Sequence, residues 1–196
     1  AARDILAARP DPNYPHPPLA KELIGLGIKF FGDNPWGWRA LQAILASFAV
    51  VTVYFIAKRL FRSRKVATVA SLLMSVEISW FVLSRVAIPE MFMISFFTFS
   101  LFFLIKFFQE KDNLSLILGS GFFGLALACK WAPLIFLPIV ALIFIRKFQL
   151  GKIEKLKVAT IASLVISAAY LLPFFLLPVH PSAQDIISFH TKTIKF

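Results

Sequence analysis

Charged residues are scarce in this sequence, and cysteine is almost missing. Asp, Glu, Lys and Arg make up 16% of the 196 residues, against about 25% in an ordinary soluble domain. Apolar residues make up 59%, and the mean hydropathy is +0.79. A soluble domain of this length has too little interior to bury that much apolar surface. The composition therefore excludes a soluble globular enzyme and a disordered chain.

Several familiar site patterns are also missing. A single cysteine, Cys129, excludes an intramolecular disulfide and a cysteine metal cluster. The sequence contains no HExxH, no GxxxxGK[ST], no nucleotide fingerprint and no metal-ligand spacing, so we name no metal ligand and expect no tightly bound cofactor. The first residue is Ala rather than Met, and no signal-peptide pattern opens the chain. We interpret the chain as an internal piece of a longer protein.

Positive charge is what the sequence has in excess. Its 21 Lys and Arg residues and 10 Asp and Glu residues give a net charge of +11. In a membrane protein such an excess usually lies in cytoplasmic loops that face anionic lipid, so we do not expect a nucleic-acid partner. The runs KRLFRSRK (58–65) and RKFQLGKIEKLK (146–157) are strongly basic. We expect both in the cytoplasm, together with QEKDN (109–113).

Apolar stretches near membrane-spanning length, about 20 residues, fill most of the chain. They cover 40–57, 66–84, 91–108, 114–145 and 158–178. One helix over 114–145 would overshoot the hydrocarbon core of ~30 Å and place the two basic runs on opposite sides. Splitting this stretch at Lys130 places both runs on one side. We therefore predict an all-α fold, a polytopic transmembrane helical bundle with six spans.

The first 39 residues differ from the rest because they are polar, Pro-rich and aromatic. After Pro18, the run LAKELIGLGIKFF has the apolar spacing of a short amphipathic helix at the membrane surface. Trp36 and Trp38 are typical interfacial anchors. We therefore divide the chain into an extracytoplasmic loop (1–39), a six-helix transmembrane region (40–178) and the start of a second extracytoplasmic loop (179–196).

The predicted topology gathers ionisable residues on the outer face. Arg39, at the end of a span, has a simpler interpretation as a side chain that snorkels to the membrane interface. Arg85 and Glu90 have a simpler interpretation as a surface ion pair. Lys130 lies inside an apolar run, where ionisable groups tend to be functional. Arg offers two-pronged contacts and Lys a point charge to a lipid phosphate. The residues alone leave enzyme, transporter and scaffold open. The full set is His16, Lys21, Arg39, Arg85, Glu90, Lys130 and His190.

Several motifs, in order along the chain, resemble one enzyme family. They are ARDIL (2–6), HPPLAKELIGLG (16–27), Trp38-Arg39, SRVAIPE (84–90), GLALACKW (124–131) and FHT (189–191). They resemble segments of the protein O-mannosyltransferases, the dolichyl-phosphate-mannose–protein mannosyltransferases of the GT-C superfamily. The resemblance covers essentially the whole chain, from the family's first outer loop through six spans. HPPLAK and LACKW together are its most specific part.

The resemblance implies transfer of mannose, with inversion, from polyprenyl (dolichyl) phosphate mannose to Ser and Thr hydroxyls of secreted or membrane proteins. The family's catalytic base is the Asp of an Asp-Glu motif, which would lie ahead of Ala1, so we name no catalytic residue in this chain. Arg39 is our first candidate for the donor phosphate, followed by Lys130 and Lys21. His16 is expected to shape the acceptor loop. Family members often dimerise. They lie in the endoplasmic reticulum membrane of eukaryotes or in the plasma membrane of prokaryotes.

Two departures from the family pattern leave alternatives open. Glu90 stands where the family usually has Asp, and Tyr14 where it often has an acidic residue. A GT-C transferase using another sugar, or a lipid or glycan acceptor, is the first alternative, although many of those read Lys-Pro-Pro-Leu at the position of His16. A lipid-phosphate transporter is the second. The outer position of the cations and the lack of a visible repeat in the sequence count against a transporter.

Overall fold

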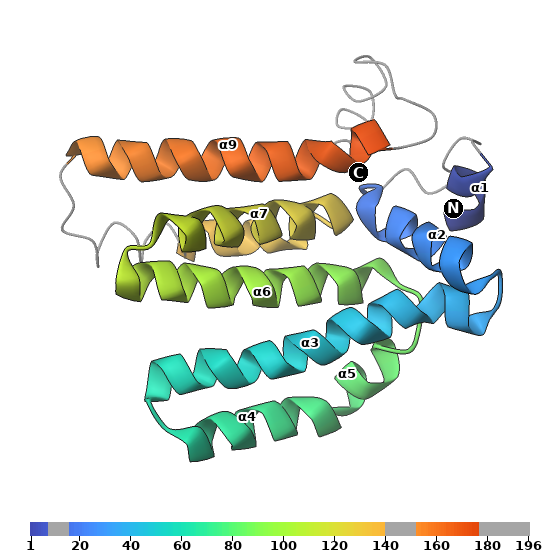
Figure 1. The fold of residues 1–196 in the computed structure, drawn as a ribbon, viewed down its shortest axis with the longest axis horizontal. Helices are drawn as coiled ribbons and strands as arrows, with labels where there is room; N and C mark the ends of the chain where they lie inside the picture. Colours follow the sequence, from blue (N-terminus) through green and yellow to red (C-terminus); the bar gives the residue numbers. More distant parts are fainter. Residues whose placement is uncertain (8–15, 140–151, 177–196) are drawn as a thin grey trace.

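The computed structural model describes residues 1–7, 16–139 and 152–176, and this part consists of helices without a strand (Figure 1). The predicted all-α fold is confirmed. The elements are α1 (Ala2–Leu6), α2 (Leu19–Phe31), α3 (Pro35–Phe61), α4 (Arg64–Val76), α5 (Ile78–Leu83), α6 (Pro89–Glu110), α7 (Asn113–Cys129), the 3-10 helix η1 (Ala132–Phe136) and α9 (Lys152–Leu176).

Three helices are long and apolar enough to cross a membrane, namely α3, α6 and the part of α9 from Leu156 to Phe175. The apolar helix α7 has 17 residues, fewer than the about 20 that a span needs. The described residues therefore do not confirm six spans. The first span begins at Pro35 rather than Ala40, because proline fits a first helical turn and the Asn34 side chain accepts hydrogen bonds from two backbone N–H groups there.

The predicted second span, residues 66–84, is not one helix. Glu77 takes an extended backbone conformation between α4 and α5. Its carboxylate accepts a hydrogen bond of 2.6 Å from the backbone N–H of Trp80 and so caps α5. Within the described part of the chain, this carboxylate serves as the N-cap of α5.

The predicted break at Lys130 is confirmed. The helix α7 ends at Cys129, and Lys130 has an extended backbone conformation. Pro133 then lies in the first turn of η1, where the missing N–H of proline costs no hydrogen bond. The later part of the expected fifth span, residues 140–145, lies outside the described residues.

The centre of the bundle is α7, which packs between α6 and α9 (Figure 1). The ring of Phe122 stacks on Phe96 and Phe103 of α6, with ring centroids 6.3 and 5.8 Å apart. Gly124 approaches α9 so closely that a Cβ at this position would lie 2.5 Å from the carbonyl oxygen of Ile166. Small residues permit such close approach between helices in membranes.

The helix α2 has the bounds predicted from LAKELIGLGIKFF. At its start, Leu19 and Ala20 belong to the same buried cluster as Phe92 and Cys129. At its end, Phe30 is 70% exposed. The first turn therefore docks on α6 and α7, and the last turn presents an apolar side chain suited to the predicted membrane surface.

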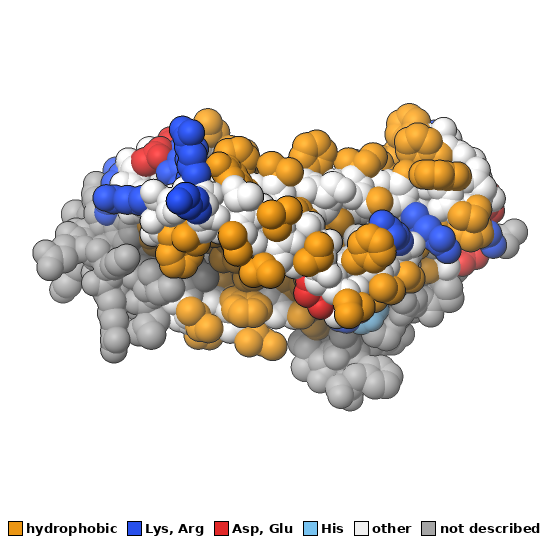
Figure 2. Space-filling model, turned by 90° about the horizontal axis from the view of Figure 1, so that it is seen from below, with side chains coloured by type: hydrophobic (Ala, Val, Ile, Leu, Met, Phe, Trp, Pro, Cys, Tyr) orange, Lys and Arg blue, Asp and Glu red, His pale blue; other side chains and the backbone are white. Residues whose placement is uncertain are grey.

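The long helices run side by side, so the turns that join them lie at the two ends of the bundle (Figure 1). The α3–α4 and α6–α7 turns (58–65 and 109–113) lie at one end, called here the Arg59 end. The helices α1 and α2 and the α5–α6 turn lie at the other, called the α2 end. Figure 2 shows apolar side chains between two groups of Lys and Arg. KRLFRSRK and QEKDN therefore share one end, as predicted, and its location in the cytoplasm stays a prediction.

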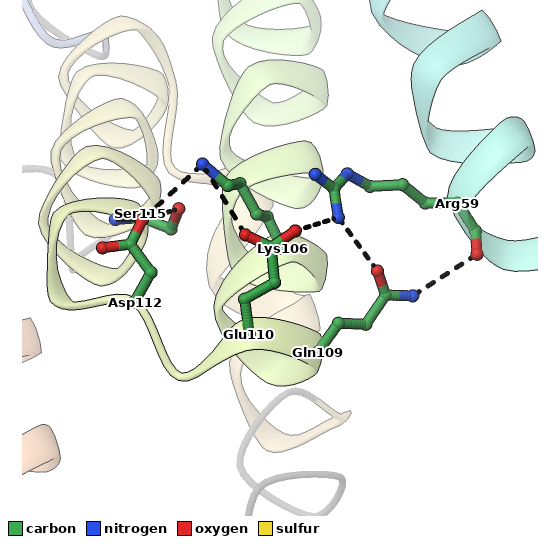
Figure 3. A network of polar contacts seen from close by, with 6 residues as sticks. All are labelled: Arg59, Lys106, Gln109, Glu110, Asp112 and Ser115. Carbon is green, nitrogen blue, oxygen red and sulfur yellow. Dashed lines mark hydrogen bonds and ion pairs between the residues drawn. The ribbon is translucent and has the colours of Figure 1, made fainter.

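At the Arg59 end, a polar network joins α3, α6 and α7 (Figure 3). The Arg59 Nη1 atom lies 2.8 Å from Glu110 Oε1. The ammonium group of Lys106 lies 3.9 Å from Glu110 and 3.6 Å from Asp112. The Ser115 hydroxyl donates a hydrogen bond of 2.7 Å to Asp112. Each of the charged groups in this network thus faces a group of opposite sign.

Candidate functional site

The ionisable residues predicted for the outer face fall into two separate groups at the α2 end. The first, called here the Lys130 cluster, contains His16, Lys21, Glu90 and Lys130. The second, called the arginine pocket, contains Arg39 and Arg85. His190 lies outside the described residues.

The Lys130 cluster is built around an ion pair. The Lys130 Nζ atom, just after α7, lies 2.6 Å from Oε1 of Glu90 in the first turn of α6. His16 is close enough to Glu90 to interact with it electrostatically. Glu90 therefore pairs with Lys130 rather than with Arg85, its partner in the simple alternative above. The charge of Lys130 is largely neutralised by this contact.

Lys21 is buried, with 3% of its surface exposed. A buried ammonium group needs polar partners, and the Lys21 Nζ atom donates a hydrogen bond of 2.8 Å to the backbone carbonyl of His16. Pro17 and Pro18, between the two residues, are buried as well. Lys21 thus fastens the His-Pro-Pro turn to the start of α2.

The arginine pocket is a cavity of about 440 Å³ at the start of α3. Its wall consists of Pro35, Trp36, Arg39, Ala40, Ala43 and Arg85. The Arg85 guanidinium lies 3.6 Å from the centre of the Phe81 ring, a cation–π contact that fixes its orientation. Among the described residues, no carboxylate forms an ion pair with Arg39 or Arg85. Two guanidinium groups therefore line one pocket with their charge uncompensated by the described part of the protein.

A larger cavity of about 940 Å³, called here the Trp38 cleft, opens between α1, α2 and the start of α3. Asp33 accepts hydrogen bonds from the Trp38 indole at 2.6 Å and from Arg3 at 3.1 Å. The hydrogen bond from Trp38 holds the pKa of Asp33 below its usual value. Lys21 also lines this cleft. Its wall combines both signs of charge with an indole, which suits a polar ligand such as a peptide or a sugar.

Glu22, next to Lys21 on α2, is an unusual carboxyl group. Burial raises its pKa from 4.5 to about 7, although the neighbouring Lys21 acts in the opposite direction. Its Oε1 atom is buried and has no hydrogen-bond partner among the described residues. The group also interacts electrostatically with Cys129 at the end of α7. A proton on Glu22 therefore favours the docking of α2 on α7.

The three residues predicted for the donor phosphate do not form one site. Arg39 is joined by Arg85, whereas Lys130 is paired with Glu90 and Lys21 bonds to a backbone carbonyl. Among the described residues, no group of three His, Cys, Asp or Glu side chains could hold a metal ion. The arginine pocket is thus the arrangement best suited to bind an anion.

No pattern in the sequence indicates a site role for Asp33, Arg3 or Glu22. Asp33 and Arg3 are 30 positions apart, and no local pattern indicates that they meet. Glu22 follows Lys21 in an amphipathic run, where adjacent opposite charges normally indicate a solvated surface. The WGWR motif did indicate an interfacial position for Trp38, but not its hydrogen bond to Asp33.

Comparison with known proteins adds an independent observation. A family model described as dolichyl-phosphate-mannose-protein mannosyltransferase matches residues 15–175. A polyprenol-phosphate-mannose–protein mannosyltransferase of Corynebacterium glutamicum is 29% identical over an alignment that covers 80% of this chain and 37% of that protein. The protein of the same name in Mycolicibacterium smegmatis is 40% identical, over 41% of this chain and 16% of its own length.

A third relative matches a segment of intermediate length. The mannosyltransferase of the same name in Mycobacterium tuberculosis is 32% identical over 60% of this chain and 22% of its own length. The chain thus spans well under half the length of these curated relatives. No solved structure matches the chain significantly.

Proposed function

The chain belongs to the dolichyl-phosphate-mannose-protein mannosyltransferase family, and from this premise we propose that the whole protein transfers mannose from a polyprenyl phosphate to Ser and Thr hydroxyls of secreted or membrane proteins, with inversion. The names of the bacterial relatives support the donor and the protein acceptor. The apolar helices α3, α6 and α9 support a membrane-bound carrier lipid. The membrane would be the plasma membrane in a prokaryote and the endoplasmic reticulum in a eukaryote.

We assign the donor phosphate to the arginine pocket, and one observation carries this assignment. Arg39 and Arg85 line the same cavity at the start of a spanning helix, and neither is paired with a carboxylate among the described residues. Guanidinium groups bind phosphate oxygens with two parallel hydrogen bonds. Trp36, which is 79% exposed on the pocket rim, is suited to the lipid interface.

This assignment gives the two arginines a role in the reaction. The acceptor hydroxyl oxygen forms a bond to the anomeric carbon while the bond from that carbon to the phosphate oxygen breaks. The electron pair of the broken bond stays on the leaving phosphate, and Arg39 and Arg85 stabilise the charge that develops there. The hydroxyl proton passes to a carboxylate, for which we propose the Asp of the family's Asp-Glu motif, expected ahead of Ala1.

The remaining predicted residues receive other roles. Lys130 and Glu90 hold the end of α7 against the start of α6, and Lys21 fastens the His-Pro-Pro turn to α2. The Trp38 cleft, which Lys21 also lines, is the proposed place for the acceptor peptide. His16 shapes the acceptor side through its position next to Glu90. Dimerisation stays a prediction.

The test uses the full-length protein in membranes, supplied with radiolabelled polyprenyl-phosphate mannose and a Ser/Thr-rich peptide. We expect labelled peptide from wild type, and loss of label in Arg39→Ala and Arg85→Ala. The matched control is Arg64→Ala, which removes an exposed arginine at the Arg59 end. Label on a lipid or glycan instead of the peptide would indicate a GT-C transferase with another acceptor. A well-folded protein that transfers to nothing would favour the transporter.

A further inference from the structure

Gln42 of α3 is a buried polar residue that has no role in the proposed mannose transfer. Its surface is 1% exposed. A buried amide is costly unless its donors and acceptor find partners. The described residues that hydrogen-bond to the Gln42 side chain all lie in one distant segment, the connection from α5 to α6.

The Gln42 side chain uses both its donors and its acceptor there. Its Nε2 group donates to the carbonyl oxygen of Leu83 at 2.7 Å and to that of Val86. Its Oε1 atom accepts a hydrogen bond of 3.0 Å from the backbone N–H of Ile88. One side chain thus ties three backbone groups of this connection to α3.

The tied segment needs this support, because it has little regular structure of its own. The helix α5 ends at Leu83 and α6 begins at Pro89. Between them, the backbone N–H of Arg85 donates to Val82 and that of Val86 donates to Leu83, each at 3.1 Å. Gln42 of α3 supplies hydrogen-bond partners to backbone groups on both sides of Arg85.

The segment also places residues in both cavities of the α2 end. Arg85 lines the arginine pocket, whereas Ala87 and Pro89 line the Trp38 cleft. Arg39 and Gln42 are three positions apart on α3, which places them on the same side of the helix. One face of α3 therefore carries Arg39, the first arginine of the pocket. The same face carries Gln42, which holds the segment that contains Arg85, the second arginine.

We infer that Gln42 is a positioning residue, which holds Arg85 beside Arg39 so that both guanidinium groups reach one phosphate. This inference rests on the proposed function. It assigns Gln42 no contact with the substrate, because its amide is fully engaged with Leu83, Val86 and Ile88. Its effect on ligand binding passes through Arg85.

The test measures binding of radiolabelled farnesyl phosphate, with farnesol as the matched ligand that lacks the phosphate, to the full-length protein in nanodiscs. Gln42→Leu keeps the approximate size of the side chain and removes its hydrogen bonds. We expect it to weaken farnesyl phosphate binding about tenfold, the loss expected for one hydrogen bond to a charged group, and to leave farnesol binding unchanged. A purely structural role would weaken both ligands alike.

A double-mutant cycle then tests whether the effect passes through Arg85. In the Arg85→Ala background, Gln42→Leu should change the affinity less than about twofold, because the group through which it acts is gone. In the Arg39→Ala background the effect of Gln42→Leu should persist. A tenfold effect in the Arg85→Ala background would overturn the inference.

Two controls keep the outcomes separate. Thr52→Val alters another polar side chain of α3, one whose hydroxyl bonds only within the helix, and should bind farnesyl phosphate like wild type. If Gln42→Leu does not fold, Gln42→Asn replaces it, since it keeps the amide on a shorter side chain. If neither Arg39→Ala nor Arg85→Ala weakens farnesyl phosphate binding, the proposed phosphate site is wrong. If both do and Gln42→Leu does not, only the inference about Gln42 fails.

Discussion

The two ends of the bundle hold similar kinds of side chains and use them differently. At the Arg59 end, Arg59 and Lys106 face Glu110 and Asp112, so positive and negative groups compensate one another across three helices. In the arginine pocket at the α2 end, no described carboxylate compensates Arg39 or Arg85. The compensated groups of the Arg59 network join three helices, whereas the two guanidinium groups of the arginine pocket are the ones we propose for a ligand. The contrast separates a structural role of Arg59 from the proposed binding role of Arg39 within one helix, α3.

The largest expected effect comes from emptying the arginine pocket of charge. The double variant Arg39→Ala/Arg85→Ala should lower kcat/KM for mannose transfer ~10²–10³-fold, because it removes the groups proposed to stabilise charge on the leaving phosphate. Steady-state transfer kinetics of the full-length protein measure this loss. A double variant with near-wild-type kinetics would show that the contrast between the two ends has no functional meaning.

The second effect concerns Glu22, a carboxyl at the α2 end that also lacks full compensation. Its pKa is raised to about 7 in the folded protein, so the folded state binds this proton more tightly than the unfolded state. The contribution of this proton to the free energy of unfolding is complete below about pH 4.5 and is lost as the pH rises to about 7. We expect stability to fall by about 1–2 kcal/mol over this window, after allowance for partial solvent exposure.

Glu22→Gln provides the comparison for this pH effect, because glutamine keeps the shape of a protonated carboxyl. Thermal unfolding of the full-length protein should depend less on pH in Glu22→Gln than in wild type between pH 4.5 and 7. Asp112 at the Arg59 end should show a pH dependence of stability with the opposite sign, because the hydrogen bond from Ser115 lowers the pKa of Asp112. Identical pH profiles for wild type and Glu22→Gln would contradict the expected burial of a neutral carboxyl.

The third effect concerns the Lys130–Glu90 ion pair, in which the two charges compensate each other although the pair lies at the α2 end. Lys130→Met should destabilise the protein by about 1 kcal/mol, because it leaves a partly buried carboxylate without its partner. Adding Glu90→Gln should restore much of this loss. A cycle of unfolding free energies in detergent measures the coupling, and strict additivity of the two changes would mean that the ion pair contributes nothing.

The smallest effect is expected at the Arg59 end itself. Arg59→Ala breaks a partly exposed ion pair with Glu110, and such pairs contribute between 0 and about 1 kcal/mol. Unfolding should therefore shift slightly, and less at high salt. Mannose transfer at saturating donor should stay at the wild-type rate. A large loss of transfer would assign function to the Arg59 end and remove the distinction between the two ends.

The sequence predicts the fold where periodicity and length decide the outcome. The helix α2, the break at Lys130 and the joint location of KRLFRSRK and QEKDN all follow from local patterns. The break at Glu77 does not, because hydropathy over a window averages one carboxyl into an apolar stretch. Its capping hydrogen bond to Trp80 decides the local structure instead.

The candidate site is less accessible to sequence reasoning, because it depends on tertiary contacts. Topology places Arg39, Arg85 and Lys130 on one face, but only packing decides that Lys130 meets Glu90 while Arg85 joins Arg39. The bonds of Gln42 reach 41 to 46 positions along the chain. A glutamine inside an apolar run carries no pattern that names its partners.

The length of α3 has a consequence for the membrane in which the protein works. Arg39 and Arg59 lie near opposite ends of this helix, and at ~1.5 Å per residue the stretch between them measures ~30 Å. This length equals the thickness of a typical hydrocarbon core. A thicker bilayer would draw one guanidinium into the acyl chains, and a thinner one would require α3 to tilt. The spacing of these two arginines therefore matches α3 to a hydrocarbon core of about 30 Å.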